Sequence, residues 1–309
     1  MQCNKCGNIA VYFNKISGVA LCKKCFMKSI EEKVRWTIGK YGLFEWNDHI
    51  LLAVSGGKDS LVMMKIIAEI EREFPQSTLI AVTIDEGIKN YREIGLKLAK
   101  KYAEKFGVEH EIYSFKKFYG YSLSEIVEKA YEKKLPHHPC TYCGVLRRKL
   151  LNVKGKELGA TKIATAHNLD DEAQTILMNI LRGDVERLIR LLRAENTKIP
   201  GFIPRVKPMQ LIPESELALY AYYSNIELYS VDCPYSHTSL RDEIRRFLNI
   251  FEKKHPGAKY SIYSSFRKIS QKLAKNMVEI EFKRCKYCGE PTTRELCRAC
   301  ELLEQLGLI

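Results

Sequence analysis

Short apolar runs alternate with longer amphipathic stretches through most of the chain. Apolar runs bounded by turn residues are typical of buried strands, whereas apolar positions that recur every three to four residues are typical of helices. The runs predict strands at residues 49–54, 78–84, 109–115, 162–166 and 227–231. The amphipathic stretches predict helices at residues 61–74, 91–106, 124–134 and 170–181, and another that ends near residue 159.

The order of these elements indicates a fold class. The predicted helices between strands are about 12 residues long, which suits the crossover that parallel strands need. We therefore predict an α/β fold with a doubly wound parallel sheet and helices on both faces. Residues 200–213 are rich in proline and predict a connecting loop. Residues 239–251 and 260–276 combine basic and aromatic side chains at helical spacing and predict two further helices.

The net charge of the chain indicates a class of binding partner. The 309 residues include 50 Lys and Arg against 37 Asp and Glu, a formal net charge of +13. Such an excess favours a polyanionic partner, because each neutralised phosphate releases a counterion, although many soluble proteins are also basic. No apolar run reaches the roughly 18 residues of a membrane span, and the N-terminus lacks the apolar core of a signal peptide. We therefore expect a cytoplasmic protein with no membrane contact.

Eleven cysteines divide along the sequence into groups of four, three and four. Inside cells, cysteines serve metal binding or catalysis more often than disulfides. Each terminal group is a pair of Cys-x2-Cys turns, and four thiolates in that arrangement complete a tetrahedron around one Zn²⁺; redox dithiols are the alternative. The predicted zinc ligands are Cys3, Cys6, Cys22 and Cys25 at one end and Cys285, Cys288, Cys297 and Cys300 at the other.

Both cysteine-rich ends are too short to hold a hydrophobic core of their own. We therefore divide the chain into an N-terminal zinc module at residues 1–30, a central domain at residues 31–280 and a C-terminal zinc module at residues 281–309. Without its ion, each module would have little to keep it folded.

The segment Ser55-Gly-Gly-Lys-Asp-Ser60 follows the first predicted strand of the central domain and opens a helix. Glycines at such a junction let backbone N–H groups approach an anion, and the helix dipole favours negative charge there. The segment does not fit the Walker A pattern. It resembles instead the PP-loop of the N-type ATP pyrophosphatases, which cleave ATP between its α and β phosphates. The resemblance implies that ATP is bound by Ala53, Ser55, Gly56, Gly57, Lys58, Asp59 and Ser60.

A second strand end leads into an acidic helix start, at residues 164–175. Carboxylates in a first helical turn are favoured by the helix dipole, so capping alone accounts for Asp170 and Asp171. Together with the loop upstream, however, the stretch resembles an acidic motif of PP-loop enzymes that modify tRNA. In that family the aspartate that matches Asp171 lies close to the Mg²⁺ of the nucleotide.

Three cysteines remain, with Cys140 and Cys143 in a predicted loop ahead of a helix and Cys233 after the last predicted strand. Three thiolates are too few for a closed zinc site but can hold a [4Fe–4S] cluster with one iron left open, to which sulfide could bind. A redox pair with an unrelated Cys233 and a thiolate that becomes a persulfide are alternatives. Because parallel strands end at one edge, we expect Cys233 and the Ser55–Ser60 loop to share a cleft.

These features together resemble the tRNA-thiolating branch of the PP-loop proteins over essentially the whole chain. The two terminal modules are similar to those of its uridine-thiolating group. The resemblance implies that residues 31–280 are a Rossmann-like PP-loop catalytic domain and that a [4Fe–4S] cluster is bound by Cys140, Cys143 and Cys233. It also implies that Arg147, Ala166 and Ile84 line the nucleotide.

The implied reaction is 2-thiolation of a tRNA uridine with ATP converted to AMP and pyrophosphate. The C2 oxygen is adenylated and then replaced by sulfur, with Asp59 and the three middle cysteines as the catalytic residues. Uridine 54 of the T-loop is the expected target, and the wobble uridine of the anticodon is the alternative. The implied partners are tRNA, whose phosphates the basic helices would cradle, and a ubiquitin-like sulfur carrier with a C-terminal thiocarboxylate; a homodimer is left open.

Other classes of function fit part of the sequence. An ATP-dependent ligase of the lysidine-forming type would use the same loop without sulfur chemistry. A zinc-ribbon nucleic-acid-binding protein could use the central domain only to sense a nucleotide. Neither class needs the three middle cysteines, so these residues favour the thiolating enzyme.

Overall fold

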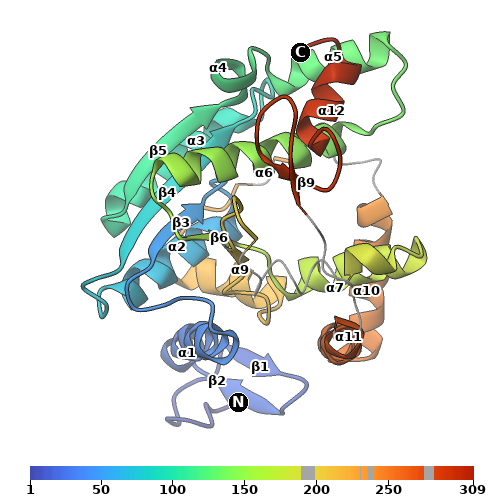
Figure 1. Cartoon of the computed structure of the whole chain (residues 1–309). Helices are drawn as coiled ribbons and strands as arrows, with labels where there is room; N and C mark the ends of the chain where they lie inside the picture. The colour runs from blue at the N-terminus through green and yellow to red at the C-terminus, as the bar shows by residue number, and fades with distance from the viewer. Residues whose placement is uncertain (189–198, 230, 236–239, 275–281) are drawn as a thin grey trace.

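A parallel sheet forms the centre of the computed structural model, which describes residues 1–188, 199–229, 231–235, 240–274 and 282–309 (Figure 1). Its five strands run in the order β5-β4-β3-β6-β7, and each neighbouring pair is parallel. The predicted α/β class with a parallel sheet is confirmed. The strands are β3 (His49–Ala53), β4 (Thr78–Asp85), β5 (Glu109–Ser114), β6 (Lys162–Thr165) and β7 (Arg205–Val206).

The order of the strands places a topological switch point between β3 and β6. From β3 the chain adds β4 and β5 on one side, and it later adds β6 and β7 on the other. In open parallel sheets, ligands bind outside the carboxyl ends of the strands at such a point. Both candidate ATP motifs follow these two neighbouring strands, so the fold brings them together.

Helices cover both faces of the sheet, because side chains of a strand alternate between its faces. In β3, Ile50 and Leu52 pack into one core and Leu51 into the other. The first core includes residues from α1 (Lys23–Tyr41), α2 (Lys58–Glu71), α3 (Arg92–Phe106) and α9 (Glu214–Tyr223). The second includes residues from α5 (Leu123–Glu132), α6 (Pro139–Glu157) and α12 (Arg298–Gln305).

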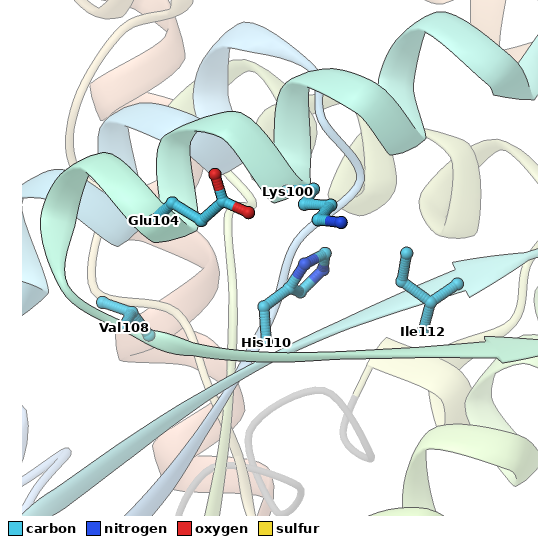
Figure 2. Close-up of a pocket in the computed structure, with 5 residues that line it drawn as sticks. All are labelled: Lys100, Glu104, Val108, His110 and Ile112. Carbon is cyan, nitrogen blue, oxygen red and sulfur yellow. The ribbon is translucent and has the colours of Figure 1, made fainter.

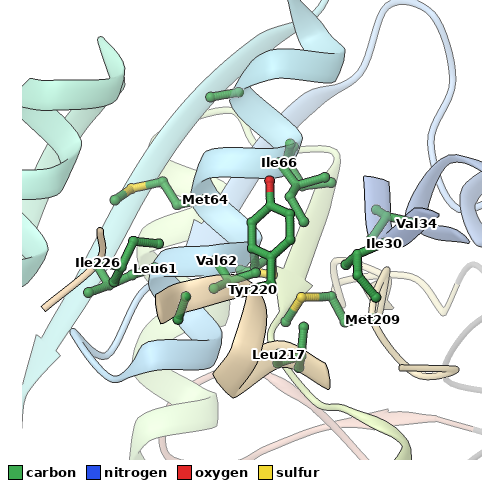
Figure 3. Packing of buried hydrophobic residues seen from close by; sticks show 14 of the residues in the cluster. Ile30, Val34, Leu61, Val62, Met64, Ile66, Met209, Leu217, Tyr220 and Ile226 are labelled. Carbon is green, nitrogen blue, oxygen red and sulfur yellow. The ribbon is translucent and has the colours of Figure 1, made fainter. Parts of the chain in front are cut away.

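Figure 3 shows the first core at the meeting point of three of these helices. Tyr220 and Leu217 of α9 lie between Val62 and Ile66 of α2 and Ile30 of α1. All five side chains are buried, so α9 joins the N-terminal helix to the helix that follows the candidate ATP loop. The sequence did not reveal α9, whose first turn carries Glu214 and Glu216 after Pro213.

Three helices form a separate group beside the sheet. They are α7 (Leu169–Leu181), α10 (Leu240–Lys254) and α11 (Ala258–Ala274), which confirm the helices predicted near these ranges. Small hydrophobic clusters hold them together, with Ile176 of α7 against Phe266 of α11 and Ala173 of α7 against Leu248 of α10. Figure 1 shows α10 and α11 away from the strands of the parallel sheet.

The terminal modules each add a two-stranded antiparallel sheet. These pair β1 (Tyr12–Asn14) with β2 (Val19–Leu21), and β8 (Lys283–Arg284) with β9 (Pro291–Thr292). A short helix, α4 (Phe115–Tyr119), follows β5 directly. Helix α1 continues past residue 30, the predicted end of the N-terminal module. The division of the chain into residues 1–30, 31–280 and 281–309 stays a prediction. Within the described residues, no helix is both long and apolar enough to cross a bilayer.

Several sequence predictions are wrong in detail. Residues 227–229 form no strand, because the Glu227 N–H donates to the Tyr102 hydroxyl at 2.7 Å rather than to a neighbouring strand; residue 230 lies outside the described residues. Part of the predicted proline-rich loop forms β7, which needs only two residues to extend the sheet. Cys140 and Cys143 lie in the first turns of α6 rather than in a loop, since Pro139 is pre-organised for a helix start and His138 caps it.

Candidate nucleotide and metal sites

The loop after β3 is held against α3 by a close backbone approach. Gly56 has φ of 83°, and a Cβ there would lie 2.0 Å from the carbonyl oxygen of Gly95. A Cβ on Gly95 would lie 2.8 Å from the Ser55 carbonyl oxygen. Only glycine fits at both positions, and this lets the loop pack closely against α3. Gly95 was not identified in the sequence, because its partner is 39 residues away.

Hydrogen bonds within the loop fix that shape further. The Ser60 hydroxyl accepts from the Ser55 N–H at 3.2 Å and donates to the Gly57 carbonyl at 2.8 Å. Gly57 is the N-cap of α2 and has no side chain to accept from the first-turn N–H groups. Those groups and the helix dipole therefore remain available to an anion such as a phosphate.

Charged side chains meet at the start of α2. Lys58 forms an ion pair with Glu214 at 2.6 Å and contacts Asp59 at 3.4 Å. The Asn168 amide donates to Asp59 at 3.1 Å. Burial raises the pKa of Asp59 to about 6; Lys58 opposes this shift, and Glu214 and Asp171 add to it. Lys58 contacts two of these carboxylates and Asp171 lies near Asp59, so the group keeps negative charge that a divalent cation would neutralise.

The end of β6 contributes the second motif. Ala166 packs against the first core, and Asn168 forms a reciprocal capping box with Asp171 at the start of α7. Asp171 also lies 3.6 Å from the guanidinium of Arg241 in α10. Asp170 has a different role: it is buried, pairs with Lys259 and accepts from the Glu214 N–H at 2.8 Å. Asp171 lies close enough to Asp59 to raise its pKa, whereas Asp170 serves the packing of α7.

A cavity lies between the loop and α6. Its lining residues are Ala53, Val54, Ser55, Val82, Ile84, Glu86, Arg92, Arg147 and Leu151. Four predicted nucleotide contacts, Ala53, Ser55, Ile84 and Arg147, are thus brought together. Two lining residues with charged side chains, Glu86 and Arg92, were not predicted from the sequence. A single acidic residue after a strand, such as Glu86 after β4, forms no motif that would mark it.

Glu86 and Arg92 organise this cavity. Glu86 is buried and pairs with Arg92 at 2.7 Å and with Arg147 at 3.3 Å. Arg92 also donates to the Ser55 carbonyl at 3.1 Å and to the Ile84 carbonyl at 2.8 Å. Two guanidinium groups around one carboxylate leave an excess of positive charge, which suits a phosphate in the cavity.

The three middle cysteines lie on the same side as this cavity. Cys143 is one helical turn before Arg147, and Cys143 and Cys233 both pack at the edge of the second core. Cys140 is exposed, and its thiol lies 3.5 Å from the Tyr235 carbonyl. Burial raises the pKa of Cys143 to about 11, although the Arg147 guanidinium opposes the shift. The three sulfurs do not all lie within 4.8 Å of one another, unlike those of the terminal groups.

Each terminal group of cysteines forms a compact set of four sulfurs. Among the described residues, the ligand atoms of Cys3, Cys6, Cys22 and Cys25 lie within 4.8 Å of one another, and so do those of Cys285, Cys288, Cys297 and Cys300. Tetrahedral Zn–S bonds of about 2.3 Å imply sulfurs about 3.8 Å apart. The Cys6–Cys22 and Cys288–Cys297 sulfur distances are 3.5 and 3.7 Å.

Backbone groups favour the thiolate form of one buried cysteine in each set. Burial alone would raise the pKa of Cys3, but N–H donors of Cys22, Lys5 and Cys6 outweigh it and bring that pKa to about 6. The pKa of Cys285 is lowered to about 6 in the same way, by N–H donors that include Cys297. The donor sets therefore fit closed metal sites with no vacancy for catalysis.

A cavity of about 400 Å³ lies elsewhere, along the edge strand β5 (Figure 2). Lys100 and Glu104 of α3 face His110 and Ile112 of β5 across it, with Val108 at one end. The His110 ring is 2.8 Å from the Thr83 hydroxyl, and burial lowers its pKa. None of these residues belongs to the motifs at the switch point.

Comparisons with known proteins agree with this arrangement. A PP-loop domain family matches residues 27–250, and the N-terminal LIM domain family of the 2-thiouridine synthetase TtuA matches residues 2–27. A probable sulfurtransferase of Methanocaldococcus jannaschii is 39% identical over 99% of this chain and 88% of its own. Cytoplasmic tRNA 2-thiolation protein 1 of Caenorhabditis briggsae is 36% identical over 98% of this chain and 80% of its own.

A solved structure is similar over the full length. The U34-tRNA thiolase NcsA of Methanococcus maripaludis, determined with its [4Fe–4S] cluster, is 38% identical to this chain. It covers 100% of this chain with 97% of its own, at a TM-score of 0.87. The chain therefore belongs to the family of PP-loop proteins that includes the archaeal and eukaryotic tRNA thiolation proteins.

Proposed function

We propose that this protein is an enzyme that 2-thiolates a uridine of tRNA at the expense of ATP. One observation carries the proposal: a single cavity is lined by Ser55 of the PP-loop and by Arg147, which lies one turn from Cys143 on α6. An ATP bound at the loop would therefore lie beside the three middle cysteines. A lysidine-type ligase or a nucleotide sensor would have no use for those thiols.

The ATP site would position the nucleotide for attack at its α phosphate. The first-turn N–H groups of α2 and the Lys58 ammonium would bind the β and γ phosphates, and Arg92 and Arg147 would bind charge inside the cavity. Asp59 and Asp171 would hold Mg²⁺, whose charge neutralises the departing pyrophosphate. Holding the uracil C2 oxygen against the α phosphate would then be mainly a matter of proximity.

The donor set of Cys140, Cys143 and Cys233 fits a [4Fe–4S] cluster. Thiolates that bind different irons stand farther apart than four thiolates on one zinc, which agrees with the wider spacing of these sulfurs. When bound, such a cluster would supply one iron without a protein ligand, the chemistry that delivery of sulfur requires. The positive charge of Arg147 would offset the negative charge of the thiolates beside the nucleotide.

The terminal cysteine quartets fit two structural zinc ions by number, distance and backbone N–H donors. We further propose that residues 1–30 and 281–309 act as zinc modules around a catalytic domain at residues 31–280. The name of the nematode relative supports a cytoplasmic location.

The wobble uridine is the target that we favour over uridine 54 of the T-loop. The solved relative that matches the full chain is a U34-tRNA thiolase. The N-terminal family match to TtuA keeps uridine 54 as the alternative. A ubiquitin-like carrier with a C-terminal thiocarboxylate remains the proposed sulfur source. The proposed assembly is a homodimer, which light scattering would check.

The test is a reconstituted reaction under anaerobic conditions with tRNA, ATP and sulfide. We expect 2-thiouridine at position 34, AMP as the nucleotide product, and loss of both with Cys143→Ser. Tandem mass spectrometry of digested tRNA distinguishes position 34 from position 54. ADP as the product, or full activity of iron-free protein, would contradict the proposal.

A further inference from the structure

An aromatic ladder runs along the outer face of α10. Phe247 and Phe251 lie one turn apart on α10, and His255 follows directly after the last residue of the helix. The Phe247 and Phe251 rings stack with centroids 5.8 Å apart and an interplanar angle of 23°, and the His255 ring lies 4.5 Å beyond Phe251. Phe247 is 55% exposed and Phe251 40%, although burying such rings would stabilise the fold.

Helix α10, which carries the ladder, begins beside the candidate active site. Arg241, in the first turn of α10, lies 3.6 Å from Asp171 and donates to Thr175 at 2.9 Å, so α10 is anchored beside the Mg²⁺ ligand. With a rise of about 1.5 Å per residue, Phe247 stands roughly 9 Å along the axis from Arg241 and Phe251 roughly 15 Å. A single strand of RNA with its reacting base at the active site would cover these distances within a few nucleotides.

Cations flank the rings. Arg246 is exposed but pairs with Asp242, whereas Lys253 and Lys254 are exposed and make no ion pair within the described part of the chain. Lys254 lies one turn beyond Ile250 and Phe251, on the face of the ladder. Unpaired lysines beside exposed rings are what a polyanion with flat bases needs, because the lysines neutralise phosphates while the rings stack on bases.

We propose that α10 binds the single-stranded loop of the tRNA next to the target uridine, with bases stacked on Phe247 and Phe251. Helical RNA would present its bases only edge-on, so the ladder selects an unpaired loop. The inference rests on the proposed function, since it takes the bound RNA to be the substrate. It explains why the rings lie exposed on a strongly basic chain, which neither helix packing nor α10's buried residues Ile244 and Leu248 require.

The test measures binding of a fluorescent anticodon stem-loop, with a hairpin of the same stem closed by a minimal tetraloop for comparison. The double variant Phe247→Ala/Phe251→Ala should bind the stem-loop at least roughly tenfold more weakly, because each base that loses an aromatic platform weakens binding. Phe247→Leu/Phe251→Leu should be nearly as weak, since leucine keeps the apolar area but not the flat ring. Tyr131→Ala, which removes a 65% exposed ring from α5, is the matched control and should bind normally.

A salt series adds an independent readout. Lys253→Gln/Lys254→Gln should lower the slope of log affinity against log salt by about 0.7 for each RNA phosphate that the variant no longer neutralises. Light scattering and circular dichroism of every variant check assembly and folding.

The outcomes separate the two hypotheses. Normal stem-loop binding by the alanine variant, while wild-type protein thiolates tRNA, would overturn the role of α10 and leave the function intact. Normal stem-loop binding by the leucine variant would overturn it too, since apolar area without a flat ring would then suffice. A switch from dimer to monomer on alanine substitution would also overturn it, since the rings would then belong to a protein contact. Wild-type protein that neither binds nor thiolates tRNA would instead overturn the proposed function.

Discussion

Asp59 shows how much of a site's chemistry comes from residues that the local motif does not contain. The motif predicts the aspartate, and the structure surrounds it with Asn168 and Glu214, both more than 100 residues away. Such neighbours depend on the packing of α9 against α2 and on where the start of α7 lies, which no local pattern encodes. The residues of the loop could therefore be predicted from the sequence, whereas the partners that set its electrostatics could not.

We expect Asp59→Asn to stabilise the ligand-free protein at alkaline pH. The folded-state pKa of about 6 exceeds the ordinary value of 3.8, so the folded state binds more protons and stability falls as pH rises through this window. Above it, ionised Asp59 costs about 3 kcal/mol at most. Urea unfolding should show the variant more stable than wild type at pH 8 and equal to it near pH 3.5. A variant less stable at pH 8 would contradict this interpretation.

The same substitution should remove nucleotide binding. Asparagine cannot supply the charge that Mg²⁺ requires, so the variant should lose MgATP binding by calorimetry while its zinc content stays at the wild-type level. A variant that is both more stable and inactive would be the signature of a strained functional carboxylate. Unchanged MgATP affinity would exclude Asp59 from the cation site.

Lys149 is a second residue whose partner is distant in sequence. Its ammonium donates to the Cys300 thiol at 3.3 Å, and the nearby cysteine thiols raise its pKa. Four thiolates on Zn²⁺ carry a net negative charge, which this lysine would offset. We expect Lys149→Met to release the proposed C-terminal zinc at least several-fold faster in a chelator assay and Lys149→Arg to resemble wild type. The N-terminal zinc is an internal control, and equal acceleration of both would refute the assignment.

At the scale of elements, the sequence predicted most of the central strands and helices, because apolar periodicity follows burial. The prediction failed where tertiary contacts, rather than local periodicity, determine the secondary structure. Residues 227–229 have the composition of a strand, yet their backbone is held by Tyr102. Strand β7 is too short to leave a pattern, and α9 is buried along much of its surface, so its amphipathic signal is weak.

Among the contacts between elements, the one between α3 and the PP-loop is the one that we expect to tolerate substitution least. Gly95→Ala would place a Cβ 2.8 Å from the Ser55 carbonyl and 2.9 Å from the Tyr229 hydroxyl, so the loop must shift. We expect a loss of ATP affinity of at least tenfold by calorimetry. Gly39→Ala in α1 is the matched control: its Cβ meets nothing within 4 Å, and it should stabilise the protein by about 0.5–1 kcal/mol without changing ATP binding. Normal ATP binding by Gly95→Ala would show that the loop adapts.

At the scale of the whole molecule, each terminal module extends the core on a different face of the sheet. Cys3, Cys22 and Phe26 join the core that contains α2 and α9, and Ala299 and Leu302 join the one that contains α6. Further contacts fix both attachments. The Tyr12 hydroxyl donates to Glu216 of α9 at 2.6 Å, and the Asn152 amide of α6 donates to Glu290 at 2.9 Å. The N-terminal module thus supports the helix whose Glu214 binds Lys58, while the C-terminal module supports the helix that carries Cys140 and Cys143.

Loss of either metal should therefore loosen a different half of the active site. Hydrogen exchange measured by mass spectrometry should show Cys3→Ser raising exchange in α1 and α9 while α6 stays protected. Cys297→Ser should do the reverse, because the face of the sheet that each module covers limits how far local unfolding spreads. Serine is nearly isosteric with cysteine, so the changes report loss of the ion rather than of packing volume. Equal exchange increases on both faces would mean that the modules act on one cooperative core. Unchanged exchange with loss of zinc would mean that the contacts of Tyr12 and Asn152 hold the modules without their ions.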